Sequence, residues 1–311
     1  MSINQHFDAF ASGLLALCML FFNCSLRSGV NSLLDTISKV LNFSSGCMQI
    51  TTHRRTVLVV SKELLRAPLD QAEISRLITP YWRVKVVELT STTQGDLAQL
   101  VRDGKAKVGD VIVAEYQSAG RGRLDRSFEA AQGTALLFSF YIKPQRNRDD
   151  WGWIPLIAGY SVAQSLHAFH AVVKWPNDIL IKGKKVSGLI AEVVGDGVVI
   201  GIGVNVGMEE NQLPVDTATS LLVEGGEDIT RDELICEILE EFEEHFLQWD
   251  QGIDEVQPLY KQLSATIGTE VRVEYPGGAS QHGIAEGISD TGALILNDGT
   301  HVQSADVIHL R

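Results

Sequence analysis

The sequence has few cysteines, and they are not arranged to hold a metal. Its 311 residues contain four, Cys18, Cys24, Cys47 and Cys236, with no C-x-x-C pair and no histidine at ligand spacing. Zinc sites and disulfide frameworks both depend on such paired spacings. We therefore predict reduced thiols in a cytoplasmic protein, with neither a zinc site nor a disulfide framework.

Positive charge is also scarce, since 26 Lys and Arg face 39 Asp and Glu and the net charge is -13. A protein that coats nucleic acid needs a broad basic surface to neutralise phosphates, so no nucleic-acid partner is expected. The P-loop pattern G-x-x-x-x-G-K-[ST] is missing as well. The glycines at 195, 197, 201, 203 and 207 do not have the G-x-G-x-x-G spacing, and we interpret them as hairpin turns and close strand packing.

The one long hydrophobic run, residues 9–22, is short for a membrane span. As a helix its fourteen residues would extend about 21 Å, whereas a bilayer core is about 30 Å thick. No Lys or Arg precedes the run, which is unlike a secretory signal. We predict that residues 1–54 are a dispensable extension, with Met48 as an alternative start. A docking helix and a membrane-associating segment are the remaining interpretations.

From residue 55 onward the pattern is that of an α+β protein with a mixed, largely antiparallel sheet. Strands are expected at 57–61, 83–89, 110–116, 133–142, 171–175, 178–181, 185–194 and 198–206, and helices at 68–78, 90–104, 153–169 and 234–249. Thr230 and Glu233 form a capping box before the last helix. After residue 265, short strands separated by "PGG", "SDTG" and "NDG" predict a small β-barrel.

A basic loop, which we call the arginine loop, follows the strand at 110–116, in the stretch "AEYQSAGRGRLDRSF" at 114–128. Gly120 and Gly122 allow the backbone to turn and to approach a ligand closely. Arg121, Arg123 and Arg126 supply planar cations suited to carboxylate and phosphate oxygens. The loop predicts a site for an anionic ligand, although a solvated basic loop would have the same composition.

A second polar cluster lies at 174–188. "KWPND" places a cation, an amide and a carboxylate beside a proline turn, and "KGKK" brings three lysines just before Gly188. A hairpin that returned these lysines toward the arginine loop would build a strongly cationic pocket. The chemistry-bearing residues of this cluster are Lys174, Asn177, Asp178, Lys182, Lys184 and Lys185.

Six segments, taken together and in order, resemble the biotin protein ligases. They are "STTQ" at 91–94, the loop at 114–128, "LLFSFYIKP" at 136–144, "VVKWPNDILI" at 172–181, "KVSGLIAE" at 185–192 and "IGIGVNV" at 200–206. The resemblance covers residues 57–311 and is to the form without a helix-turn-helix repressor domain. It implies a class II synthetase-like catalytic domain, a mixed sheet with helices on one face, at 55–264, and an SH3-like β-barrel at 265–311.

The resemblance also implies a two-step reaction with ATP and biotin as substrates and Mg²⁺ as the metal. Biotin would be activated as biotinyl-AMP and then transferred to a lysine of a biotin carboxyl carrier protein. Fixed cations and a metal offset the repulsion between a carboxylate and a triphosphate, so a cationic pocket suits this chemistry.

Roles follow residue by residue from the same resemblance. Lys185 and Arg121 would be catalytic. The residues expected at biotin are Ser91, Thr92, Thr93, Gln117, Arg121, Gly122, Arg123, Lys185 and Gly188. Those expected at ATP or the adenylate are Gly120, Arg123, Arg126, Phe128, Lys174, Trp175, Asn177, Asp178 and Asn205, with Asp178 the candidate Mg²⁺ ligand. For Trp175, core packing at the sheet edge is an equal alternative.

Three positions depart from the family pattern. Thr93 stands where an asparagine is common, Asp125 where a glycine is usual and Phe128 where a tryptophan is usual. The shorter Thr93 side chain puts one biotin contact in question, and Asp125 changes the charge of the arginine loop. None of the three removes a group that adenylation needs.

Two other functions fit parts of the sequence. A lipoate or octanoate ligase would use the same adenylate chemistry on another carboxylate, and a ligase-like regulatory protein would use the barrel as an interaction module. The intact Arg121, Arg123 and Lys185 disfavour the second. No DNA or membrane binding is expected, and monomer and homodimer are equally consistent with the sequence.

Overall fold

The computed structural model describes residues 63–123, 126–226 and 229–310. Every described element belongs to one compact unit, which lies within residues 56–311. The predicted extension at 1–54, the strand expected at 57–61 and Asp125 lie outside the described residues.

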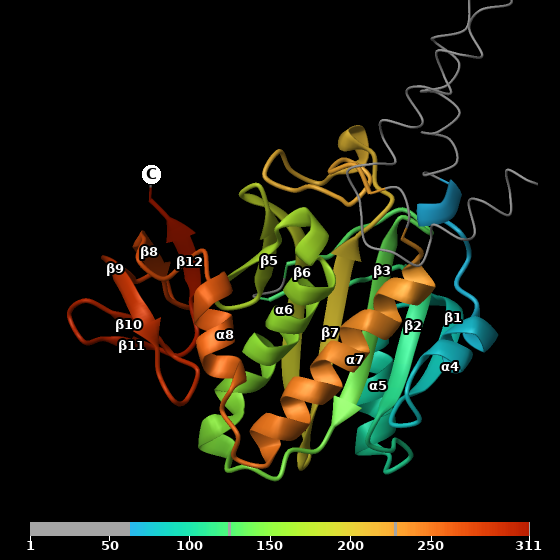
Figure 1. The fold of residues 1–311 in the computed structure, drawn as a ribbon, viewed down its shortest axis with the longest axis horizontal. Helices are drawn as coiled ribbons and strands as arrows, with labels where there is room; N and C mark the ends of the chain where they lie inside the picture. Colours follow the sequence, from blue (N-terminus) through green and yellow to red (C-terminus); the bar gives the residue numbers. More distant parts are fainter. Residues whose placement is uncertain (1–62, 124–125, 227–228, 311) are drawn as a thin grey trace, which may run out of the picture. The chain divides into compact units, whose positions relative to one another are not determined.

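The larger part is built on a seven-stranded mixed sheet with the strand order β1-β2-β3-β7-β6-β5-β4 (Figure 1). Its strands are β1 (Arg83–Thr90), β2 (Asp110–Gln117), β3 (Ala135–Ile142), β4 (Val172–Lys174), β5 (Asp178–Ile181), β6 (Lys184–Val194) and β7 (Gly197–Asn205). Only β1 and β2 run parallel, and all other neighbours pair antiparallel. Helix α5 (Thr93–Arg102) makes the crossover that a parallel pair requires. The predicted mixed, largely antiparallel sheet is confirmed.

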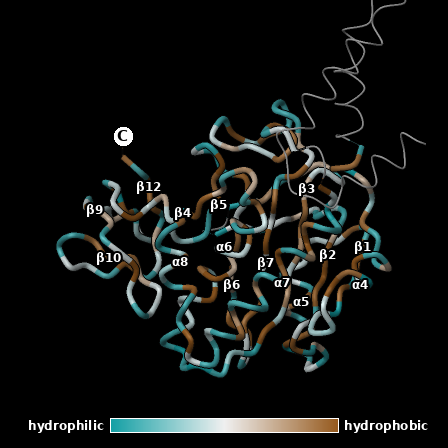
Figure 2. Tube along the Cα trace, in the orientation of Figure 1, coloured by the Kyte–Doolittle hydropathy of each residue, from teal (hydrophilic) through white to brown (hydrophobic). Residues whose placement is uncertain are grey.

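Three helices cover one face of this sheet and form the main core: α4 (Gln71–Leu77), α6 (Trp153–Ser165) and α7 (Arg231–Asp250). Side chains alternate between the faces of a strand, so Phe138 and Ile200 pack toward this core. Helix α6 is buried on nearly every side. Figure 2 shows hydrophobic residues gathered in the central strands.

Helix α5 packs on the opposite face, where Leu97 belongs to a smaller cluster with Ile112 and Val199. This helix covers only part of its face. The uncovered part of the sheet, beyond the N-terminal end of α5, is available for a ligand.

The ends of the helices follow the signals in the sequence. The Asp70 carboxylate caps α4 by accepting from the backbone N–H groups of Ala72 and Glu73. At α7 the predicted capping box is present, because Thr230 Oγ1 accepts from the Glu233 N–H at 3.1 Å and the Glu233 carboxylate accepts from the Thr230 N–H at 3.1 Å. Short 3-10 helices lie at Arg148–Gly152, His167–Phe169 and Glu210–Gln212.

A buried ion pair joins three parts of the core. The guanidinium of Arg231, 1% exposed, donates to Glu115 Oε2 on β2 at 2.7 Å and to the Ala67 carbonyl at 2.7 Å. The second carboxylate oxygen of Glu115 accepts from the Leu69 N–H at 2.5 Å. These bonds tie the start of α7 to β2 and to the segment before α4.

Helix α8 (Val256–Leu263), which the sequence did not predict, leads to a second sheet of five antiparallel strands in the order β11-β10-β9-β8-β12. They are β8 (Glu270–Glu274), β9 (Ser280–Ile288), β10 (Leu294–Leu296), β11 (His301–Val302) and β12 (Asp306–His309). The indole N–H groups of Trp153 and Trp175 donate to carbonyls of Ser289 and Gly292, each at 3.1 Å. The small domain, which fits the expected SH3-like barrel, is therefore bonded to the larger one.

Within the described part of the chain, no helix has the length and apolar character to cross a membrane.

Candidate ligand-binding site

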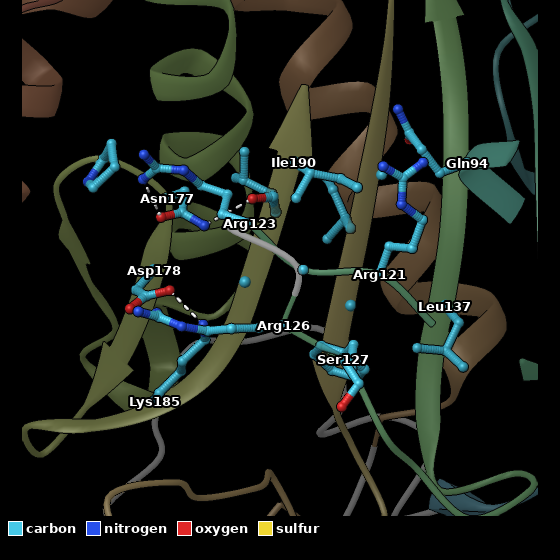
Figure 3. A pocket seen from close by; sticks show the side chains of 18 of the residues that line it. Gln94, Arg121, Arg123, Arg126, Ser127, Leu137, Asn177, Asp178, Lys185 and Ile190 are labelled. Carbon is cyan, nitrogen blue, oxygen red and sulfur yellow. Dashed lines mark hydrogen bonds and ion pairs between the residues drawn. The ribbon is translucent and has the colours of Figure 1, made fainter. Parts of the chain in front are cut away.

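A pocket of about 250 Å³ opens on the face of the large sheet that α5 leaves uncovered (Figure 3). Its floor is formed by β3, β6 and β7, and its sides by the start of α5, the arginine loop and the "KWPND" turn. Because β1 and β2 run parallel, the segments that follow them, 91–94 and 118–128, leave the sheet at the same edge. This arrangement brings together two motifs that are separated in the sequence.

Two glycines of β7 have no side chain to fill the floor of the pocket. A Cβ at Gly201 would lie 2.7 Å from Gln94 Oε1 and 3.1 Å from Ser139 Oγ, and one at Gly203 would lie 2.7 Å from the Phe128 ring. Both glycines lie inside a strand. The close strand packing predicted among these glycines is therefore confirmed for Gly201 and Gly203. Gly195, with φ of +63°, does lie at the β6–β7 turn.

One end of the pocket is neutral and polar. Gln117 Oε1 accepts from the Thr93 N–H at 2.7 Å, and the hydroxyls of Thr93 and Ser139 lie 2.8 Å apart. The family commonly has an asparagine at this position. In this protein, the Thr93 N–H and hydroxyl form hydrogen bonds with Gln117 and Ser139.

Gln94 is a site residue that the sequence did not single out, although it closes the "STTQ" motif. It is 1% exposed and lines the pocket. Its Nε2 donates to the Val199 carbonyl at 3.0 Å, which fixes the orientation of the carboxamide. Its Oε1 has no hydrogen-bond partner among the described residues.

The other end of the pocket is cationic. Arg123 Nη1 donates to Asn177 Oδ1 at 3.1 Å, and Arg123 Nη2 to the Ala305 carbonyl at 3.3 Å. Burial lowers the pKa of Arg123 below its ordinary value, with nearby Asp306 and Asp178 acting in the opposite direction. Arg126 forms an ion pair with Asp306.

Arg121 also lines the pocket, where Figure 3 shows its side chain next to Gln94, and its guanidinium has no hydrogen bond or ion pair with the residues that the structure describes. It is therefore the arginine of the loop that needs no rearrangement to receive a carboxylate or phosphate.

Lys185 reaches the same end from β6. Its Nζ lies 2.5 Å from Asp178 Oδ1, and the two side chains point toward one another in Figure 3. A Cβ at Gly188 would lie 2.8 Å from this Nζ. Gly188 therefore leaves space for the Lys185 side chain. The sequence had predicted that it leaves space for biotin.

Most of the expected site residues line this one pocket: Thr92, Thr93, Gln117, Arg121, Gly122, Arg123, Arg126, Phe128, Lys174, Trp175, Asn177, Asp178, Lys185 and Gly188. Three do not. Ser91 is exposed, and Gly120 borders an adjacent hollow. Asn205 is 6% exposed, and its Nδ2 donates to the Thr219 carbonyl at 2.9 Å. The ligand contacts of all these residues stay predictions.

Trp175 serves the core as well as the pocket. It is 2% exposed, belongs to the main hydrophobic cluster and donates its indole N–H to the small domain. The predicted core packing of Trp175 is therefore confirmed. The same side chain lines the pocket, and its contact with ATP stays a prediction.

The small domain supplies one wall of the pocket, through Glu274, Asp306, Val307 and Ile308. No motif pointed to these residues, because their place in the site depends on how the two sheets pack.

Five cationic side chains and three carboxylates line the pocket of a protein whose net charge is -13. This local excess of positive charge favours an anionic ligand. Among the described residues, no group of three or more His, Cys, Asp or Glu side chains is arranged to hold a metal by itself.

Comparison with known proteins identifies the family. Residues 85–209 match the biotin/lipoate A/B protein ligase family, and residues 266–310 match the biotin protein ligase C-terminal domain. A biotin--[acetyl-CoA-carboxylase] ligase of Mycobacterium tuberculosis is 36% identical over 267 residues, which cover 81% of this chain and 100% of the relative. The bifunctional ligase/repressor BirA of Bacillus subtilis is 33% identical over 235 residues, covering 71% of this chain and 72% of that protein.

A solved structure supports the same assignment. The biotin protein ligase of Aquifex aeolicus in complex with biotin and ATP superposes with a TM-score of 0.63 at 27% identity, covering 74% of this chain and 99% of that one. The fold and the pocket define a ligase of the biotin/lipoate type. The chain belongs to the biotin protein ligase family, as the sequence motifs had indicated.

Proposed function

We propose that this protein is an ATP-dependent biotin protein ligase. The observation that carries the proposal is one pocket with a neutral polar end beside a cationic end. The neutral end, around Gln117 and Thr93, suits an uncharged ring system, and the cationic end, around Arg123 and Lys185, suits the carboxylate and phosphates that must meet.

In the first step, an oxygen of the biotin carboxylate attacks the α-phosphorus of ATP. The new bond joins the acyl oxygen to phosphorus, the bridging bond to the β-phosphate breaks, and pyrophosphate leaves. The resting site holds Lys185 against Asp178 and Arg123 against Asn177, so both cations are positioned before the ligands arrive. We assign to Lys185 and Arg121 the stabilisation of the charge that develops on the reacting oxygens.

In the second step, a lysine amine of the acceptor attacks the acyl carbon of biotinyl-AMP. An amide C–N bond forms, the acyl C–O bond breaks, AMP leaves and the nitrogen gives up a proton to the solvent. We propose a biotin carboxyl carrier protein as the acceptor, such as that of an acetyl-CoA carboxylase, which the name of the mycobacterial relative includes. We place the reaction in the cytoplasm, and assign it to a catalytic domain at 55–264 with a barrel at 265–311.

The donor set of the pocket fits Mg²⁺. This ion prefers oxygen ligands and is bound through one or two carboxylates plus substrate phosphates, and Asp178 presents a carboxylate in the cationic end. When bound, Mg²⁺ would neutralise part of the triphosphate charge. Asp178 would hold the ion, and the Lys185 ammonium beside it would act on the same substrate oxygens.

The deciding experiment measures pyrophosphate release by the purified protein with ATP, Mg²⁺ and either biotin or lipoate. Release with biotin supports the proposal. Release with lipoate alone would select a lipoate ligase, which the matched family also includes, and release with neither would refute a ligase.

Replacing Lys185 tests the site itself. We expect Lys185→Ala to slow adenylate formation by about a hundredfold or more, because a preorganised charge at the reacting oxygens is lost. The neighbouring Lys184→Ala serves as the control, since Lys184 is exposed and lies outside the pocket. Equal turnover of the two variants, both folded by circular dichroism, would remove Lys185 from its assigned role.

A further inference from the structure

The backbone of Lys185 is held by a segment from outside the sheet, which we call the strap, residues 217–221. Strand β7 pairs with β6 only from Ser187 onward, so β7 offers no partner to Lys185. The strap takes that place, since the Lys185 N–H donates to the Thr217 carbonyl and the Thr219 N–H donates to the Lys185 carbonyl, both at 2.8 Å. On its other side Lys185 pairs with Leu180 of β5.

Asn205, the last residue of β7, anchors the strap to the sheet. Its Nδ2 donates to the Thr219 carbonyl at 2.9 Å, and its own carbonyl accepts from the Leu221 N–H at 3.0 Å. Thr219 and Ser220 are fully buried. The strap is therefore a packed part of the domain, with Asn205 at its inner side.

Glu224 ties the strap to the hairpin that carries Lys185. Its Oε1 accepts from Thr219 Oγ1 at 2.7 Å, and its Oε2 lies 2.8 Å from Lys182 Nζ. Lys182 belongs to the turn between β5 and β6, three residues before Lys185. The Glu224 side chain is nearly buried, and it bonds both the strap and the hairpin.

We propose that Asn205 and Glu224 are positioning residues for Lys185. Neither lines the pocket, and the side-chain bonds of both converge on Thr219, whose N–H holds the Lys185 backbone. When the strap loosens, the Lys185 ammonium loses its fixed place beside Asp178 and above Gly188. A displacement of about 1 Å from the chemistry can cost about a hundredfold in rate. The kinetic part of this inference rests on the proposed ligase function.

The test replaces Glu224, which touches neither substrate. For Glu224→Leu we expect the first-turnover rate of pyrophosphate release to fall about ten- to a hundredfold, while the Kd values for biotin and ATP, from calorimetry, stay within about twofold. Glu224→Gln should recover most of the rate, because its Oε1 can still accept from the Thr219 hydroxyl. The surface substitution Glu240→Leu, on the exposed side of α7, is the matched control.

A second measurement does not depend on ligase activity. Competitive acetylation with acetic anhydride, read by mass spectrometry, compares Lys185 with Lys184 in the same sample. We expect Glu224→Leu to raise the labelling of Lys185 relative to Lys184 at least severalfold, since its amine leaves the Asp178 carboxylate. Should Glu224→Leu fail to fold, Thr219→Val, which keeps the shape of the side chain and removes the hydroxyl that donates to Glu224 Oε1, takes its place.

Unchanged labelling of Lys185 in a folded variant would overturn the inference, whether or not the wild-type protein is a ligase. An unchanged rate would do the same, and so would a loss of ATP affinity as large as the loss of rate. A wild-type protein that releases no pyrophosphate with biotin contradicts the proposed function instead, and the labelling result then still decides the role of the strap.

Discussion

Gly188 and Lys185 make the clearest pair at the scale of single residues. A methyl group at position 188 would meet Lys185 Nζ at 2.8 Å and Cε at 2.9 Å. Both atoms lie at the free end of a flexible side chain, so Gly188→Ala should leave the free energy of unfolding nearly unchanged. The displaced ammonium should lower the rate of adenylate formation about tenfold or more, measured by pyrophosphate release.

A second glycine supplies the control. Gly159 lies inside α6, where an added Cβ would have only Leu189 Cδ2 nearby, at 3.6 Å. Gly159→Ala should therefore keep its activity and gain about 0.5–1 kcal/mol of stability from the better helix former. A Gly188→Ala enzyme as active as Gly159→Ala would contradict the role given to Gly188.

The sequence could predict the site residues that lie within a short, chemically distinctive stretch of the chain. Gly120 to Arg126 combine glycine and arginine within one loop, and Lys185 follows a lysine-rich turn. Asp306 could not be predicted, because it meets Arg126 only through the packing of two domains. The sequence indicated Asn205 as an ATP contact but not its bond to the Thr219 carbonyl, because that bond depends on how residues 217–221 fold back on the sheet.

At the scale of elements, the junction of α7 with β2 depends on the buried pair of Arg231 and Glu115. Removing one partner of such a pair leaves an uncompensated charge inside the protein and typically costs about 3–5 kcal/mol. We expect Arg231→Met to lower the free energy of unfolding by about this amount, measured by urea denaturation.

The paired substitution separates charge from packing. Replacing both partners, as in Glu115→Leu with Arg231→Met, should recover much of the stability, because no unpaired charge remains. The recovery will be incomplete, since the carbonyls of Ala67 and Ala135 lose their donor. A single variant as stable as the wild type would show that the pair has no such role.

Elements with strong end signals were predicted well, and those governed by neighbours were not. The capping box fixed the start of α7, and Gly104, with φ of +67°, follows the end of α5 as expected. The glycines of β7 could not be separated into turn and strand positions from the sequence, because Gly201 and Gly203 are distinguished by their close contacts with Gln94, Ser139 and Phe128. Helix α8 went unpredicted because it is short and has no side-chain cap.

At the scale of the whole molecule, a hydrogen bond that depends on pH lies inside the small domain, next to its contact with the larger one. His309 Nε2 lies 3.1 Å from Thr266 Oγ1, and Thr266 Oγ1 also accepts from the backbone N–H of Trp175 in the larger domain. Burial, and secondarily the charge of Lys174, lower the pKa of His309. The neutral ring is therefore favoured in the folded protein, and its contribution to stability is lost as the pH falls below its unfolded pKa of about 6.5.

The lowered pKa of His309 should make the stability of the protein depend on pH. Between about pH 7.5 and pH 5.5 the wild-type protein should lose more stability than His309→Gln, which keeps a hydrogen-bonding group without a titrating one. Thermal unfolding at both pH values measures the difference. Parallel losses in the two proteins would exclude His309 as the acid-sensitive group.

The fragment 48–311 tests the dispensable extension. Every described element and every residue lining the pocket lies between positions 63 and 310. We expect this fragment to fold, by circular dichroism, and to release pyrophosphate at the rate of the full chain. A fragment that fails in either respect would assign a structural or functional role to residues 1–47.

Because the small domain forms one wall of the pocket, the order in which the chain is synthesised affects when the pocket is complete. The arginine loop leaves the ribosome well before Ser304, Ala305 and Asp306, the residues that hold Arg123 and Arg126. A growing chain therefore carries an unfinished site until the second sheet has folded against the first. The pocket therefore gains its last wall only after the end of the chain has been synthesised.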